Sequence, residues 1–143
     1  NVGGDVGTSN SWLAGASYLD LDATTSLSMA HFVWKWAPQG NWKERNFVFQ
    51  TEYLERRASS TETGWYAQAV FQPIQRWRIG ARADQLDLDG DDPRRYTVMM
   101  DWSNSEFSRL RLQFARSDSA IDDGNQWGLQ YIHSIGAHGA HAF

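Results

Sequence analysis

Polar and apolar residues alternate with a period of two along this chain, in segments of about ten residues separated by turn-forming residues. Such segments form β-strands with one polar and one apolar face, and their regular spacing is typical of an up-and-down antiparallel barrel. The chain has no stretch of about 20 apolar residues that would make a transmembrane helix. The pattern therefore predicts an all-β chain whose only means of crossing a membrane would be strands.

Eight segments of this kind fit the 143 residues, which offer no sign of a boundary between two units. We predict a single domain over residues 1–143, an eight-stranded antiparallel up-and-down transmembrane β-barrel of the outer-membrane type. Residues 1–10 are rich in Gly, Ser and Thr and are expected to form a leader or a loose loop. The predicted strands lie near 11–21, 27–37, 44–56, 63–72, 75–85, 94–103, 107–117 and 126–143.

The connections between these segments are of two kinds. Three are expected to be short, at 37–41, 72–75 and 103–106. Four are expected to be longer or more polar, at 20–26, 57–64, 85–94 and 118–125. The two kinds alternate, which predicts short periplasmic turns at one end of the barrel and longer acidic extracellular loops at the other.

The composition excludes several kinds of site and partner. Without cysteine, the chain has no disulfides, no thiol catalysis and no Cys-type zinc site. A net charge of -4, with Lys and Arg dispersed along the strands, predicts no nucleic-acid partner. The oligomeric state does not follow from these features.

The polar face of the predicted strands carries a set of charged and amide side chains that would line the lumen. These are Glu52, Gln68, Arg76, Arg78, Arg82, Asp101, Arg109, Arg111, Gln113 and Gln130. In a wide barrel they would border an aqueous channel and favour anionic or zwitterionic solutes. In a closed eight-stranded barrel the interior is filled by side chains, and the same residues would form an ion-pair network.

Aromatic residues gather at the strand ends of the apolar face, with small or aliphatic residues between them. We expect an aromatic girdle of Trp34, Trp36, Trp65, Phe71, Trp77, Trp102, Trp127 and Phe143. Girdles of this kind flank the lipid-facing band of membrane barrels. We therefore expect the outer membrane of a Gram-negative bacterium as the location, with its lipids and lipopolysaccharide as partners. A soluble ligand-binding β-barrel also alternates and stays open as a second alternative.

Residues 96–115 and 129–143, together with the similar segment 11–19, carry a family resemblance. They resemble the C-terminal barrel region of proteobacterial outer-membrane proteins labelled zinc-regulated TonB-dependent receptors or putative porins. The match is most specific at Gly136-Ala-His-Gly-Ala-His141. Because members of that family are longer, the resemblance implies a C-terminal portion or an engineered eight-stranded excision.

The resemblance implies a porin-like or uptake barrel, or the C-terminal portion of one, that passes or binds small solutes without catalysis. The last strand ends on Phe143, as in the C-terminal signature of outer-membrane barrels, so the barrel-assembly machinery is an expected partner. A structural membrane scaffold with a filled lumen is the alternative function.

Three histidines near the C-terminus, His133, His138 and His141, are candidate ligands for a divalent metal. In an extended strand His133 and His141 would lie roughly 26 Å apart, with His138 on the opposite face. We therefore favour solvated or interfacial histidines over a metal site, and predict no other cofactor.

Acidic residues cluster between Asp84 and Asp92, where carboxylates could bind calcium or bridge cations to lipopolysaccharide. Their spacing does not fit an EF-hand, so a solvated acidic rim is favoured. The chain has no Gly-x-Ser-x-Gly motif, and the nearest catalytic pair, Ser28 with His31, falls on opposite strand faces. We predict that the protein is not an enzyme.

Overall fold

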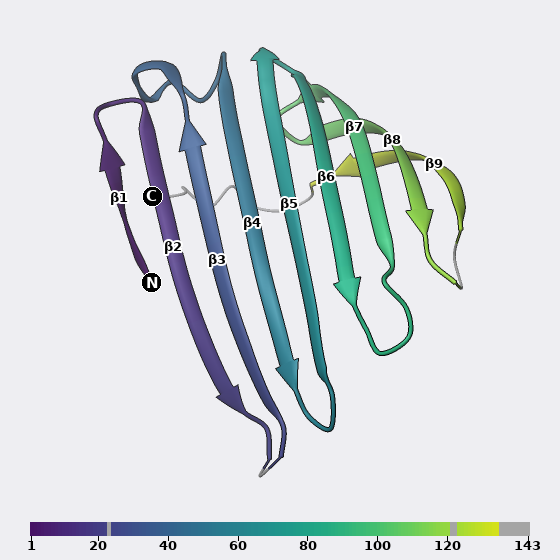
Figure 1. Ribbon diagram of the computed structural model, residues 1–143. Helices are drawn as coiled ribbons and strands as arrows, with labels where there is room; N and C mark the ends of the chain where they lie inside the picture. Colours follow the sequence, from purple (N-terminus) through teal and green to yellow (C-terminus); the bar gives the residue numbers. More distant parts are fainter. Residues whose placement is uncertain (23, 121–122, 135–143) are drawn as a thin grey trace.

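The computed structural model describes residues 1–22, 24–120 and 123–134 and consists of one antiparallel sheet (Figure 1). Each strand pairs with its neighbours in the chain. The nine strands are β1 (Val2–Val6), β2 (Asn10–Asp20), β3 (Ser26–Trp36), β4 (Asn46–Arg57), β5 (Thr61–Ile74), β6 (Trp77–Asp87), β7 (Arg94–Ser105), β8 (Ser108–Asp118) and β9 (Gly124–His133).

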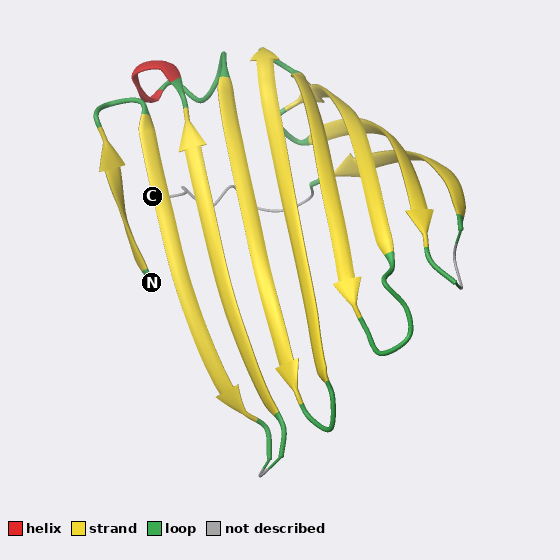
Figure 2. Cartoon of the chain, in the orientation of Figure 1, coloured by secondary structure: helices red, strands yellow, loops and turns green. Residues whose placement is uncertain are grey.

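Helical structure in the described residues is limited to one 3-10 turn, η1 (Pro38–Gly40), drawn red in Figure 2. None of the helical structure in the described ranges is both long and apolar enough to span a membrane. The prediction of an all-β, antiparallel, up-and-down chain is confirmed.

Alternating burial shows why these segments are strands. In β7 the side chains of Tyr96, Val98 and Met100 are exposed, whereas their neighbours Thr97 and Met99 are half-buried. Successive side chains of a strand point to opposite faces, so an alternating sequence places its polar and apolar residues on separate sides of the sheet. The same division of faces runs through most of the sheet.

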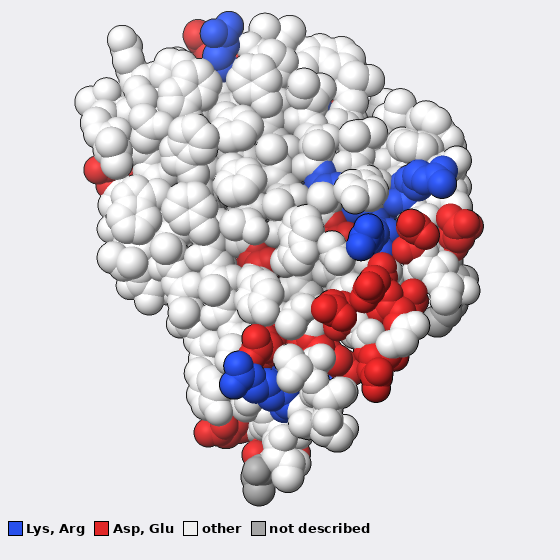
Figure 3. Space-filling model, in the orientation of Figure 1, with Lys and Arg blue, Asp and Glu red and all other residues white. Residues whose placement is uncertain are grey.

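The sheet is strongly curved, because β7, β8 and β9 turn away behind β5 and β6 (Figure 1). The face turned toward the viewer is the convex face, and most of its middle and upper part carries no Lys, Arg, Asp or Glu side chain (Figure 3). Large apolar side chains such as Ile79, Val98 and Leu112 are 40–55% exposed there. Among the described residues, the buried apolar side chains are Ala37 and Ala115 alone, so this single layer encloses no apolar core.

The strand count differs from the prediction. Residues 1–10 were expected to form a leader or a loose loop, but Val2–Val6 form β1 and pair with residues 10–14 of β2. Two glycines in this segment weaken the strand signal in the sequence, and the free backbone groups along β2 supply the hydrogen bonds that order it.

The sheet is open within the described ranges, where neither the outer edge of β1 nor that of β9 has a partner strand. The described ranges therefore hold nine strands in one open sheet in place of the eight predicted, and closure into a barrel stays a prediction. The last predicted strand, 126–143, corresponds to β9, and its residues 135–143 lie outside the described part.

Two connections differ in length from the expectation. Residues 37–45 join β3 to β4 and contain η1, so this connection is longer than the short turn predicted at 37–41. Residues 58–60 join β4 to β5, so the loop predicted at 57–64 is a tight turn. The turn-forming residues correctly predicted where the chain reverses. The two strands extend further than predicted because Arg56 pairs with Glu62 across the ladder and Arg57 pairs with Glu55 along β4.

Gly80 in β6 is a close-packed position of the inner face. A Cβ atom there would lie 2.7 Å from Met99 Cε and 3.2 Å from the Ala69 carbonyl oxygen, whereas at Gly128 in β9 the nearest atom would be 4.0 Å away. We expect Gly80→Val to lower the free energy of unfolding by about 1–3 kcal/mol through overpacking. Gly128→Val should change it by less than about 1 kcal/mol. Urea unfolding of both variants, followed by tryptophan fluorescence, checks this; equal losses would contradict the close packing at Gly80.

Candidate functional site

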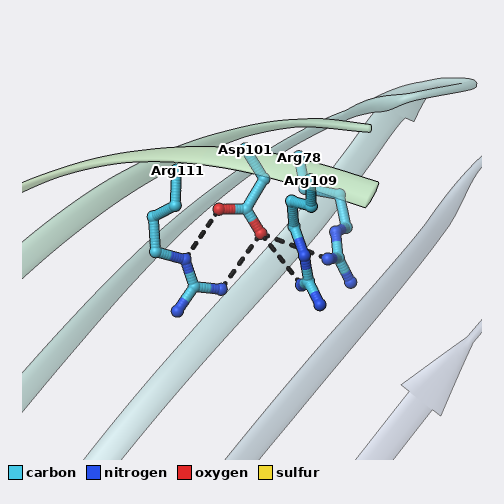
Figure 4. Close-up of polar contacts among 4 residues, drawn as sticks. All are labelled: Arg78, Asp101, Arg109 and Arg111. Atoms are coloured by element: carbon cyan, nitrogen blue, oxygen red, sulfur yellow. Dashed lines mark hydrogen bonds and ion pairs between the residues drawn. The ribbon is translucent and has the colours of Figure 1, made fainter. Parts of the chain in front are cut away.

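Four charged side chains meet on the concave face, around the carboxylate of Asp101 in β7 (Figure 4). Arg111 binds it through two nitrogens, Nε to Oδ1 at 2.8 Å and Nη2 to Oδ2 at 3.0 Å. Arg78 and Arg109 each donate through one nitrogen to Oδ2, at 3.1 and 3.2 Å. The Asp101 side chain is fully buried, and the three arginine side chains are 25–31% exposed. We call these four residues the Asp101 cluster.

The register of the sheet creates this cluster. Asp101 lies directly opposite Arg78 of β6 on one side and Arg111 of β8 on the other. Arg109 precedes Arg111 by two residues and therefore points to the same face. A buried carboxylate needs paired charge and hydrogen bonds, and the two-nitrogen contact with Arg111 already provides both. Arg78 and Arg109 are thus surplus cations, and the cluster carries a net charge of about +2.

A second group of polar residues lies nearer the β6–β7 connection. Arg82 forms an ion pair with Asp84, stacks over the ring of Tyr66 at 3.8 Å and donates to the Gln68 amide oxygen at 3.3 Å. Gln50 continues this group into β4 by bonding to both Tyr66 and Gln68. The concave face is therefore joined by hydrogen bonds from β4 to β6.

Two cavities lie along the concave face, one on each side of the Asp101 cluster. We call the end with the β2–β3, β4–β5, β6–β7 and β8–β9 connections the loop end, and the opposite end the turn end. The loop-end cavity measures about 780 Å³ and is lined by Arg82, Thr97 and Arg111 among others. The turn-end cavity measures about 650 Å³ and is lined by Arg78 and Arg109 among others. The Asp101 cluster borders both.

Most of the predicted lumen residues lie on the concave face. Within it, the structure brings together Glu52, Gln68, Arg78, Arg82, Asp101, Arg109, Arg111 and Gln113. Arg76 lies in the two-residue turn between β5 and β6, with a positive φ of 75°, and lines the turn-end cavity from there. Gln130 lies opposite Arg111, but on the exposed edge strand β9.

Tyr66 and Asp84 take part in the polar group around Arg82, although the sequence did not single them out as lumen residues. Tyr66 was not noted because an aromatic ring among Trp65 and Ala67 resembles the apolar face; its two-residue spacing from Gln68 was the available signal. Asp84 was assigned to the acidic loop, but it lies in β6 and pairs with Arg82, two residues earlier.

The predicted girdle residues within the described part lie on the convex face. Trp34, Trp65, Trp77 and Trp102 are about 40% exposed and Trp127 is 73% exposed. Trp36 and Phe71 are half-buried on the same face. Phe143 lies outside the described residues. The soluble ligand-binding barrel, which would need these tryptophans enclosed and the arginines exposed, stays an alternative prediction.

The candidate metal ligands are only partly described. His133 ends β9 and stacks on Tyr131, with ring centroids 6.2 Å apart, while His138 and His141 lie outside the described residues. No group of three or more His, Cys, Asp or Glu within the described ranges could hold a metal ion. The predicted site at the three histidines therefore stays a prediction.

The loop end is strongly charged, as Figure 3 shows along the lower and right margins. In the β6–β7 connection, mutual backbone hydrogen bonds between Leu88 and Asp91 close a tight turn around Gly90, whose φ is 96°. In the β2–β3 connection, the backbone N–H and hydroxyl of Thr24 donate to Asp22 and hold the pKa of its carboxyl group below its usual range.

The candidate catalytic pair does not come together. Ser28 pairs with Tyr18 and Glu55 on the outer rows of the sheet, whereas His31 pairs with Gly15 and Glu52 on the inner rows. The side chains of Ser28 and His31 therefore point to opposite faces.

Comparison with known proteins adds one relative. No family model matches the chain, and no solved structure matches it. An uncharacterized protein of Aquifex aeolicus (strain VF5) is 30% identical over 128 residues, covering 69% of this chain and 27% of the relative. The chain thus spans about a quarter of the length of that relative. Its description names no activity, so the function is argued from the geometry of the sheet.

Removing the charge of Asp101 tests the cluster. We expect Asp101→Asn to destabilise the fold by about 3–5 kcal/mol, because three guanidinium groups lose the carboxylate that compensates them. Asp84→Asn is the matched control: it breaks an ion pair whose arginine is 39% exposed, and should cost less than about 1 kcal/mol. Urea unfolding measures both, and a loss for Asp101→Asn no larger than for Asp84→Asn would show that the cluster is not structural.

Proposed function

We propose that this chain is the wall of a bacterial outer-membrane barrel, with its convex face in lipid and its concave face lining a polar lumen. It would act as a porin-like or uptake barrel, or as part of one, passing or binding small solutes without covalent chemistry. The observation that carries the proposal is the inverted distribution of side chains: the aromatic and aliphatic residues are on the outside, and the one large fully buried side chain described is Asp101.

A single sheet with this distribution needs an apolar environment. Soluble domains bury the apolar face of a sheet against a second layer, and among the described residues no second layer covers the convex face. Exposed apolar patches of this extent mark interaction surfaces, and the acyl chains of a bilayer fit one that is continuous across the strands. The backbone groups inside such a sheet are satisfied by the strand ladder, as the bilayer requires.

The position of the aromatic residues along two strands supports this orientation. In β5, Trp65 and Phe71 flank Ala67 and Ala69, and in β7, Tyr96 and Trp102 flank Val98 and Met100. Aromatic residues at both ends of an aliphatic band are typical of lipid-facing strands.

The position of the Asp101 cluster also supports the alternative, a membrane scaffold with a filled lumen. The cluster lies between the two cavities and holds its arginines by direct contacts, as a plug would. Conductance in planar bilayers separates the two functions, since steady openings favour the pore and silence favours the scaffold.

Two adjacent methionines provide a matched test of which face meets lipid. Met100 is 42% exposed on the convex face, and Met99 lines the loop-end cavity on the concave face. We expect Met100→Lys to cost about 2–4 kcal/mol of folding free energy in lipid vesicles, because it places a charge in hydrocarbon. Met99→Lys reaches the polar cavity and should cost less than about 1 kcal/mol. Urea titration of both variants measures this, and the reverse order would overturn the proposed orientation.

Refolding provides an independent test. The chain diluted from urea into detergent micelles should give a compact, heat-modifiable band on SDS gels, which should be missing when detergent is omitted, because the convex face then has no apolar partner. A monomeric fold in plain buffer, resistant to iodide quenching of its tryptophans, would instead support a soluble ligand-binding barrel.

A further inference from the structure

The two cavities of the concave face are basic, although the chain as a whole has a net charge of -4. The charged residues lining the loop-end cavity are Arg82, Arg94, Arg95, Arg111 and Asp84. Those lining the turn-end cavity are Lys43, Arg76, Arg78, Arg109 and Glu106. Each cavity thus has four cations against one carboxylate, while much of the acidic charge lies at the loop end (Figure 3). A cavity lined by one sign of charge concentrates ions of the other sign.

Within this basic surface, Arg78 and Arg109 differ from the other arginines. Their Nη2 and Nη1 atoms reach the same oxygen, Asp101 Oδ2, at 3.1 and 3.2 Å, so the two guanidinium groups converge (Figure 4). Arg111 alone suffices to neutralise Asp101. A guanidinium group has five N–H donors, and Arg78 and Arg109 each use one nitrogen on Asp101. Both side chains also line the turn-end cavity.

We propose that Arg78 and Arg109 form a binding site for a small oxyanion of the carboxylate or phosphate type in the turn-end cavity. This inference rests on the proposed function, since it names the class of solute that the polar lumen holds. Planar guanidinium groups match the two oxygens of such an anion. Asp101 holds the pair in place before the ligand arrives, and Arg111 holds Asp101.

The site has the charge balance that a binding step needs. An anion between Arg78 and Arg109 would offset the surplus charge of about +2 without competing for the Arg111–Asp101 pair. The half-buried position of both arginines weakens competition from water, so the attraction exceeds that of a surface pair. In a pore, a site of this kind favours anions over cations.

Inorganic phosphate is the probe for the test. The chain is folded in micelles of a detergent without phosphate groups, and its melting temperature is followed as sodium phosphate replaces sodium chloride at constant ionic strength. We expect a saturable rise. In the double variant Arg78→Gln/Arg109→Gln the apparent affinity should fall at least tenfold. This variant should still fold, because it removes two like charges and leaves the Arg111–Asp101 pair intact.

Arg82→Gln is the matched control, because it removes a cation of the same face that lines the loop-end cavity. It should leave the phosphate effect in place. An equal loss in Arg82→Gln, or an unchanged effect in the double variant, would overturn the site. The proposed membrane function would instead be contradicted if the chain failed to fold in micelles, or if Met99→Lys lost more folding free energy than Met100→Lys. A chain that folds in micelles but shows no saturable phosphate effect would contradict the anion site alone.

Discussion

The backbone ladder of the antiparallel sheet is the constraint on which the rest of this structure depends. Because hydrogen bonding between neighbouring strands alternates the direction of side chains, every residue is assigned to one of two faces. A slip of one residue would turn Asp101 and the arginines outward and Met100 and Trp102 inward. Such a slip would be energetically unfavourable on both faces. The pattern of polar and apolar residues in the sequence therefore selects the register of the sheet.

The concave face shows how charge is accommodated without an apolar core. Asp101 is buried because three arginines from β6 and β8 surround it, and these arginines are held in the half-buried space by the same carboxylate. The Arg82 group repeats the arrangement nearer the loop end, with Tyr66 and Gln68 taking part of the role of a counter-ion. Polar side chains therefore give this face the rigidity that packed aliphatic residues give an ordinary core.

Local pattern predicted the strands well and the ends of the strands less well. The predicted segment 27–37 is β3 within one residue at each end, since Phe32 and Trp34 alternate with His31 and Val33. β1 was missed because Gly3 and Gly4 give no alternation, and the segment is ordered by the edge of β2. Most of the concave-face residues were predicted as a set, but Tyr66 and Asp84 were not, because residue type suggested an outer face for one and a loop for the other.

The sequence by itself determined that the chain is all-β and which residues share a face, because an alternation of period two is local and each strand carries it independently. The tertiary structure alone decided that the apolar face is convex, that the described sheet stays open with nine strands, and that Arg78, Asp101, Arg109 and Arg111 meet. These features depend on curvature and on the register between strands. Residues as far apart as Arg78 and Arg111 reach the same carboxylate, that of Asp101, only when three strands are aligned, and no local pattern specifies that alignment.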